Sequence, residues 1–278
     1  MISLAADNAT RFKLDASRFD AGDGVLLIGH GTRDAEGTRQ FFELGERLIS
    51  RLAPVPVEPC LLELQPPTIE QGWTKLVQRG VRRIIAAPLL LFSAGHAKSD
   101  IPDALNACLK ASPSLTWRES RPLSRAPELL SLLLKRLDAA LAQSSVPMEN
   151  TAIVMVGRGS FDPCAQADMK LLTHWVAGQR QASIVRTAFY AMAEPRLPVV
   201  LTEVASLPTI QTVIVHPHLL FEGSLYQSIL KQVAETAEAF PSKRFIASSY
   251  LGPEPEVADA IIRRLASAKQ PRADFLLA

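Results

Sequence analysis

The sequence predicts an α/β fold of two similar halves, each a mainly parallel four-stranded sheet flanked by helices. Short aliphatic runs alternate with longer segments of helical periodicity along the chain, a pattern typical of parallel sheets covered on both faces. Blocks of sequence also recur at a nearly constant spacing, which indicates one unit written twice. With 278 residues, of which 47% are hydrophobic, the chain is long enough for two medium-sized cores.

The repeat consists of three blocks that occur in the same order in both halves. The segment VLLIGHGTRD at 25–34 aligns with IVMVGRGSFD at 153–162, so that Gly29 and Gly157 are 128 residues apart. Pro66-Pro67 aligns with Glu194-Pro195 at the same spacing, and IIAAPLLLF at 84–92 aligns with VIVHPHLLF at 213–221, one residue further on. Three blocks in one order make chance similarity improbable.

The elements of the first half follow from the alternation of short runs and periodic segments. Strands are expected at Gly24–Ile28, Val57–Leu62, Arg83–Leu89 and Leu115–Arg118, with helices near Asp34–Arg51, Thr68–Gln78, Ile101–Lys110 and Ala126–Leu141. The segment Gln143–Asn150 is expected to be the linker, because Ser144, Ser145 and Pro147 break the helical pattern. The expected division is an N-terminal extension at 1–22, a first domain at 23–145 that carries the site, and a degenerate second domain at 146–278.

Composition excludes several classes of protein. The formal net charge is only +2, far from the basic excess of a nucleic-acid binder. The N-terminal segment has no apolar core of signal-peptide length, and apolar runs such as Ile84–Phe92 are too short to span a bilayer. The three cysteines, Cys60, Cys108 and Cys164, are widely spaced and odd in number, which fits a reducing cytoplasm. We interpret all three as small buried hydrophobic residues. No nucleic-acid or membrane partner is therefore expected.

Three polar residues follow strands of the first half, where parallel sheets place their ligands. His30 lies between glycines after the first expected strand, Glu63 follows the second, and His96 follows the third beside Gly95. Each histidine alone is weak evidence of function, but two histidines at one sheet edge are a testable geometric prediction. Two imidazoles and a carboxylate bind a borderline divalent metal and leave coordination positions open. Open positions are what catalysis or metal transfer requires.

The motifs that carry these residues resemble the class II chelatases, specifically the two-domain sirohydrochlorin chelatases of the CbiX and SirB type. The matching segments are GVLLIGHGTRD, LLELQPPTI, IIAAPLLLFSAGHAKSDIP and, in the second half, VGRGSFDP. The resemblance implies two Rossmann-like, chelatase-like domains and insertion of Co2+ or Fe2+ into sirohydrochlorin, in cobalamin or siroheme biosynthesis. It also implies that His30 and His96 bind the incoming metal and that Glu63 completes the catalytic set. The metal is a substrate, and no organic cofactor is expected.

The second half departs from this motif at every expected site position. Under the alignment Arg158 replaces His30, Ala191 replaces Glu63 and Leu225 replaces His96. One active centre per chain is therefore expected. A monomer would contain the paired-domain cleft for which a single-domain relative would need a homodimer.

A carboxylate-rich tetrapyrrole needs basic partners, and Arg33, Lys98 and Arg158 are the expected substrate-binding residues because they adjoin the site turns. His216 and His218 flank Pro217 and could form a second metal site; strand-end histidines satisfied by the backbone are the alternative. His174 lies within an expected helix and is assigned to the surface or an interface.

Two other functions stay open from the residues alone. A metal or tetrapyrrole carrier would use the same histidines without inserting metal. A histidine phosphatase also places a His-Gly turn after its first strand, but its nucleophilic histidine follows an arginine directly, whereas His30 follows Gly29. Neither Co2+ nor Fe2+ is favoured by the residue types, because both accept imidazole and carboxylate ligands.

Overall fold

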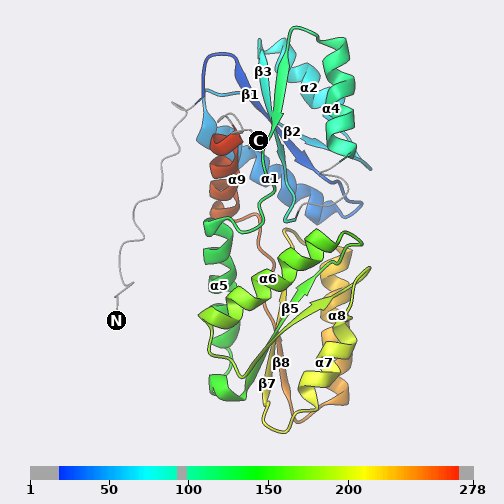
Figure 1. Ribbon diagram of the computed structural model, residues 1–278, viewed down its shortest axis with the longest axis vertical. Helices are drawn as coiled ribbons and strands as arrows, with labels where there is room; N and C mark the ends of the chain where they lie inside the picture. Colours follow the sequence, from blue (N-terminus) through cyan, green and yellow to red (C-terminus); the bar gives the residue numbers. More distant parts are fainter. Residues whose placement is uncertain (1–18, 93–98, 269–278) are drawn as a thin grey trace, which may run out of the picture.

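The computed structural model describes residues 19–92 and 99–268, and it contains two parallel four-stranded sheets (Figure 1). The strands of the first sheet are β1 (Asp23–Gly29), β2 (Val57–Leu61), β3 (Arg83–Pro88) and β4 (Thr116–Glu119), in the order β2-β1-β3-β4. The second sheet consists of β5 (Thr151–Gly157), β6 (Ile184–Phe189), β7 (Thr212–Pro217) and β8 (Arg244–Ala247), in the order β6-β5-β7-β8. The two halves thus share one strand order.

Strand register repeats as well as strand order. Val25 in β1 is level with Val57 in β2 and Ile85 in β3. The equivalent Ile153 in β5 is level with Val185 in β6 and Ile214 in β7. The predicted α/β fold of two related units is confirmed.

Helices flank both sheets. They are α1 (Ala35–Leu52), α2 (Ile69–Gln78), α4 (Asp100–Ala111), α5 (Pro127–Leu141), α6 (Pro163–Gln179), α7 (Leu197–Ala205), α8 (Ser224–Ala239) and α9 (Pro255–Ala268). Side-chain caps mark the starts of α1, α2 and α6. Asp34 and Thr68, expected as first helical residues, instead precede α1 and α2 as caps: Asp34 accepts a hydrogen bond from the Gly37 amide, and Thr68 forms a capping box with Gln71. A short 3₁₀ turn, Met148–Asn150, leads into β5.

The two C-terminal helices of the repeats are exchanged between the units. Helix α9, from the end of the second half, packs against α1 and β3 of the first unit. Helix α5, from the end of the first half, packs against β7 of the second unit, and the two helices contact each other (Figure 1). Each compact unit is therefore built from both halves of the chain. The predicted domain boundary between residues 145 and 146 describes the sequence repeat and stays a prediction.

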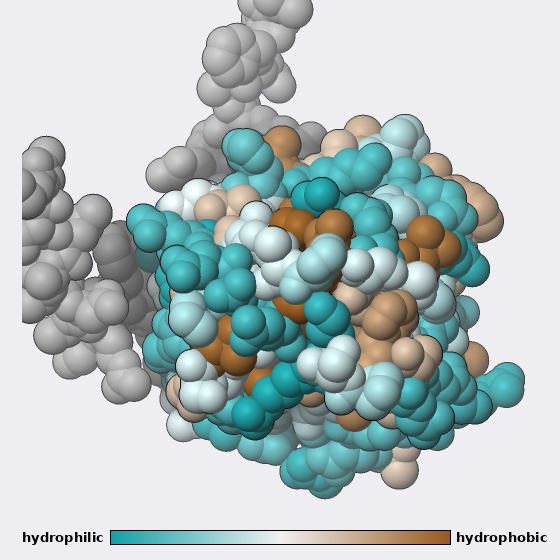
Figure 2. Space-filling view, turned by 90° about the horizontal axis from the view of Figure 1, so that it is seen from below, coloured by the Kyte–Doolittle hydropathy of each residue, from teal (hydrophilic) through white to brown (hydrophobic). Residues whose placement is uncertain are grey.

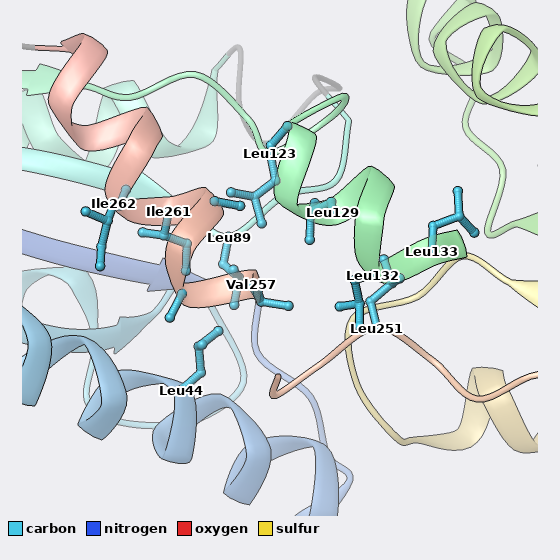
Figure 3. Close-up of a cluster of buried hydrophobic side chains, with 14 of the residues drawn as sticks. Leu44, Leu89, Leu123, Leu129, Leu132, Leu133, Leu251, Val257, Ile261 and Ile262 are labelled. Atoms are coloured by element: carbon cyan, nitrogen blue, oxygen red, sulfur yellow. The ribbon is translucent and has the colours of Figure 1, made fainter. Parts of the chain in front are cut away.

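The exchange joins the apolar cores. One cluster of buried residues continues from the first half into the second. Figure 3 shows Val257, Ile261 and Ile262 of α9 beside Leu44 of α1, with Leu129 of α5 nearby in the same cluster. Because the part of this cluster that lies between the units is removed from water only when they are docked, it favours a fixed arrangement of the two sheets.

A buried polar contact reinforces the docking. Gln40 of α1 is 3% exposed, and its amide donates a hydrogen bond of 2.8 Å to the Tyr250 hydroxyl. Its side-chain oxygen accepts one of 3.0 Å from the Glu222 amide. Both partners belong to the second half, so the amide group of Gln40 holds the two halves together at this point.

Within the described residues, no helix combines the length and apolarity needed to cross a bilayer. At the far end of the second unit, hydrophilic residues predominate and apolar residues are scattered among them (Figure 2). Scattered apolar side chains are normal on a protein surface.

Candidate functional site

Backbone contacts bring the turn after β1 against the loop after β2. The Leu62 amide donates to the Gly29 carbonyl at 2.8 Å, and the Glu63 amide donates to the His30 carbonyl at 3.2 Å. Gly31 has a φ of +98°, and a Cβ atom there would lie 2.1 Å from the Glu63 carbonyl oxygen. Only glycine permits this approach, so the Gly-His-Gly sequence places His30 beside Glu63.

The side chains of His30 and Glu63 also meet. His30 Nε2 lies 3.1 Å from Glu63 Oε1, with the two side chains 31% and 48% exposed. The predicted convergence is thus observed for this pair. His96 and Lys98, the other residues expected here, lie outside the described residues.

His30 lines a cavity of about 300 Å³ between the units. Phe41 and Leu89 of the first half line it, as do Arg158 and Leu225 of the second. His30 therefore borders a partly open space between the units, consistent with a role in handling a ligand.

A larger cavity of about 870 Å³ also lies between the units. The first half contributes Leu89, Leu90, Leu91, Phe92, Ser99 and Asp100, and the second half contributes residues of the turn after β5 and the loop after β7. Arg158 and Leu89 line both cavities, so the two spaces adjoin. A large, mostly apolar cavity with a few polar groups is typical of a binding site for an organic ligand.

The turn after β5 presents a different surface from its counterpart. Arg158 is exposed on the cavity wall and, within the described part of the chain, no ion pair neutralises it. Phe161 lines the same cavity and is 82% exposed. Sequence reasoning missed Phe161, although an aromatic residue at the position of Arg33 in a polar turn was a detectable signal.

Arg33 is exposed on the turn that carries His30. Unlike Arg158, it is not among the described residues that line the two cavities. Its role in substrate binding stays a prediction.

His216 and His218 are buried, at 0% and 3% exposure, and their ring centroids are 5.8 Å apart. Burial lowers the pKa of His216 well below its usual value and that of His218 to about 4. His216 Nδ1 lies 2.6 Å from the Ser248 hydroxyl. No hydrogen-bond partner of the His218 ring nitrogens occurs among residues 19–92 and 99–268. The alternative in which the backbone satisfies these histidines is therefore wrong for both rings, since the partner of His216 is a side-chain hydroxyl.

The part of the chain that the structure describes contains no group of three or more His, Cys, Asp or Glu side chains placed to hold a metal ion. His216 and His218 thus have no third donor within that part. His30 and Glu63 supply two donors, and the third expected donor, His96, lies outside it.

The interpretation of all three cysteines as buried is wrong for one of them. Cys60 and Cys108 are buried, and burial raises the pKa of both thiols. Cys164 is exposed, because it stands in the first turn of α6 outside the face that α6 buries against the core. His174 lies on the exposed face of α6, as expected.

Comparison with known families decides the relationship. The family model described as CbiX matches this chain twice, over residues 24–140 and 152–268. The chain belongs to the CbiX family. The two matched segments coincide with the repeat seen in strand order and register, so each half of the chain carries one copy of the CbiX sequence repeat.

Relatives of this CbiX chain carry two functional names. A protein of Priestia megaterium named sirohydrochlorin ferrochelatase is 32% identical over 84% of this chain and 85% of its own length. One named sirohydrochlorin cobaltochelatase, from the same organism, is 29% identical over 86% of this chain and 78% of its own length. The solved structure of SirB from Bacillus subtilis with Fe3+ superposes with a TM-score of 0.79 at 28% identity, covering 88% of this chain and 95% of that one.

Proposed function

We propose that this protein is a sirohydrochlorin chelatase, which inserts a divalent metal into the tetrapyrrole. The contact between His30 and Glu63 beside the interdomain cavities is the observation that carries the proposal. The names of the CbiX relatives supply the substrate class. The proposal is supported by the position of the His30 imidazole and the Glu63 carboxylate, which lie together beside a space for an organic ligand.

The chemistry has two requirements. The metal must be presented with exchangeable ligands, and the two pyrrole nitrogens that receive it must lose their protons. The His30 imidazole binds the incoming metal, and its few protein ligands leave positions open for the ring nitrogens. Glu63, in contact with His30, helps to hold the metal and accepts one pyrrole proton, and the second proton passes to water. His96 is proposed as the second imidazole ligand.

The tetrapyrrole occupies the larger cavity. Its walls of Leu90, Leu91 and Phe92 suit the faces of the macrocycle, and the exposed Phe161 can pack over one of them. Arg158 pairs with a peripheral carboxylate, for which a guanidinium is a strong partner. Arg33 and Lys98 are proposed as further carboxylate partners at the site turns. Binding of a bent macrocycle in a cavity of fixed shape would favour the geometry needed for metal entry.

One centre per chain follows from the asymmetry of the halves. The Ala191 amide donates to the Arg158 carbonyl at 2.8 Å, as Glu63 does to His30, so the backbone of the site is repeated while its donor groups are not. We further propose a monomer, because one chain supplies both walls of the cavity. It would act in the cytoplasm without an organic cofactor, nucleic acid or membrane partner.

The metal is the remaining choice, since relatives of similar identity are named for iron and for cobalt. The test is anaerobic incubation of the protein with sirohydrochlorin and Co2+, Fe2+ or Ni2+ in separate reactions, with the absorbance of the macrocycle followed in time. At least one metal should be inserted faster than in a protein-free control. Binding of metal and tetrapyrrole without turnover would instead support the carrier function.

A further inference from the structure

The wall of the larger cavity contains a buried polar side chain that the proposed chemistry does not use. His218 follows β7, and its amide donates to the Val156 carbonyl at 2.8 Å, which fixes the residue at the carboxyl end of the second sheet. Its ring lies against Phe92 of the first half, with centroids 5.6 Å apart. His218 thus stands where the two units meet and lines the cavity.

The ring nitrogens of His218 lack protein partners within the described residues, although the side chain is 3% exposed. Burying an unpartnered polar group is destabilising. The equivalent position in the first half is Leu89, which lines the same cavity and leaves no polar atom unsatisfied. An apolar residue therefore fits at this position of the fold. A histidine here indicates that a ligand supplies the missing hydrogen-bond partner.

Two other roles fit the surroundings poorly. A metal ligand would need further donors, and the described residues offer no third His, Cys, Asp or Glu to join His216 and His218. A general base would need a pKa near the working pH, whereas burial lowers the pKa of His218 to about 4. The neutral imidazole that results has one N–H donor and one lone pair.

We propose that His218 is a substrate-binding residue, whose ring turns toward the larger cavity when the tetrapyrrole binds, so that the imidazole N–H donates a hydrogen bond to one of its carboxylates. This inference rests on the proposed function, which supplies the anionic ligand. Arg158 lines the same cavity and brings a positive charge to it, which favours an anionic ligand there. The second half lacks the metal donors of the first half and contributes carboxylate recognition instead.

The test is anaerobic spectroscopic titration with metal-free sirohydrochlorin. His218→Leu, which copies the residue at position 89, should weaken binding by about tenfold to a hundredfold, the usual effect of losing a hydrogen bond to a charged group. His218→Phe should do the same while retaining a planar ring against Phe92. His218→Gln keeps an N–H donor and should restore part of the affinity. The exposed His174→Leu is the matched control and should bind as the native protein does.

Two further measurements separate this inference from its alternatives. The thermal midpoints of His218→Leu and His218→Phe should equal or exceed the native value, because neither buries an unpartnered nitrogen. Co2+ titration without tetrapyrrole should give the native stoichiometry in both. Native sirohydrochlorin affinity in folded His218→Leu or His218→Phe would overturn the inference, as would the loss of a Co2+ equivalent. If the native protein neither binds sirohydrochlorin nor inserts metal, the proposed function itself fails.

Discussion

His30 Nε2 and Glu63 Oε1 are 3.1 Å apart, although 33 positions separate the two residues in the sequence. The contact exists because β1 and β2 are parallel neighbours whose carboxyl ends meet at one edge of the first sheet. The backbone hydrogen bond from Glu63 to the His30 carbonyl fixes the loops beneath it. The strand pairing and this backbone hydrogen bond therefore position the two residues beside each other.

Glu63→Gln should lower the rate of metal insertion by about a hundredfold or more, which is the usual contribution of a positioned general base. The amide keeps the shape of the side chain but cannot accept a pyrrole proton or place a negative charge on the metal. Initial rates at saturating sirohydrochlorin measure the effect. Glu46→Gln, on the exposed face of α1, is the control for loss of one carboxylate. Equal rates for the two variants would remove Glu63 from the chemistry.

His96→Ala should abolish or severely reduce metal insertion, because no other residue between Gly95 and Asp100 has a comparable nitrogen donor. The variant should fold and can still bind sirohydrochlorin, so that binding and insertion separate. Leu225→Ala, at the equivalent position of the second half, removes no lone pair and should mainly loosen packing. Assays of insertion and of tetrapyrrole binding on both variants check this. Near-normal insertion by folded His96→Ala would exclude the residue as a required ligand.

Gly31→Ala should disrupt the site by forcing the two loops apart. Its Cβ would lie 2.1 Å from the Glu63 carbonyl oxygen, in a backbone conformation with φ of +98°. Gly80→Ala is the matched control, since its φ is +80° but no atom lies within 4 Å of the added carbon. We expect the control to lose about 1 kcal/mol of unfolding free energy. Gly31→Ala should lose more unfolding free energy than the control and should also lose insertion activity. Urea unfolding measures both losses, and equal losses for the two variants would show that the contact with Glu63 does not matter.

The sequence predicts the fold well because its main signals are local or repeated. Alternating strands and helices give the class, and the repeat gives two units of one strand order. The exchange of α5 and α9 could not be predicted, because periodicity shows that a helix such as α9 has an apolar face but not which sheet it covers. The hydrogen bond between Gln40 and Tyr250 could not be predicted either, since it joins residues far apart in the chain.

The site was predictable where strand ends carry polar residues, as at His30 and Glu63. The state of His218 was not, because a strand-end histidine can bond the backbone, a ligand or another side chain. Only burial and the surrounding side chains distinguish these cases. Phe161 was overlooked because apolar residues in turns usually pack inward, whereas this one stands exposed on the cavity wall.

Acid should destabilise the native protein partly through His218. Burial lowers the pKa of this imidazole to about 4, whereas in the unfolded chain it is about 6.5. Between these values the unfolded state binds more protons, so the free energy of unfolding falls as the pH drops below about 6.5. The loss from this group reaches on the order of 3 kcal/mol by pH 4.

Urea unfolding of native protein and His218→Leu across pH 4 to 7 tests this. The variant should lose less stability than the native protein over that range, by an amount that grows toward pH 4. His174→Leu, which removes an exposed histidine, should follow the native curve. If the free energy of unfolding fell equally with pH in native protein and in His218→Leu, the pKa of the His218 imidazole would not be lowered in the folded state.

The most direct test of the central claim compares anaerobic metal insertion into sirohydrochlorin by native protein, by His30→Ala and without protein. Native protein should accelerate insertion of Co2+ or Fe2+, and His30→Ala, with its metal ligand removed but its fold retained, should lower the rate by about a hundredfold or more. A folded His30→Ala protein that inserts metal at the native rate would contradict the account, as would a native rate no faster than the protein-free reaction for each metal.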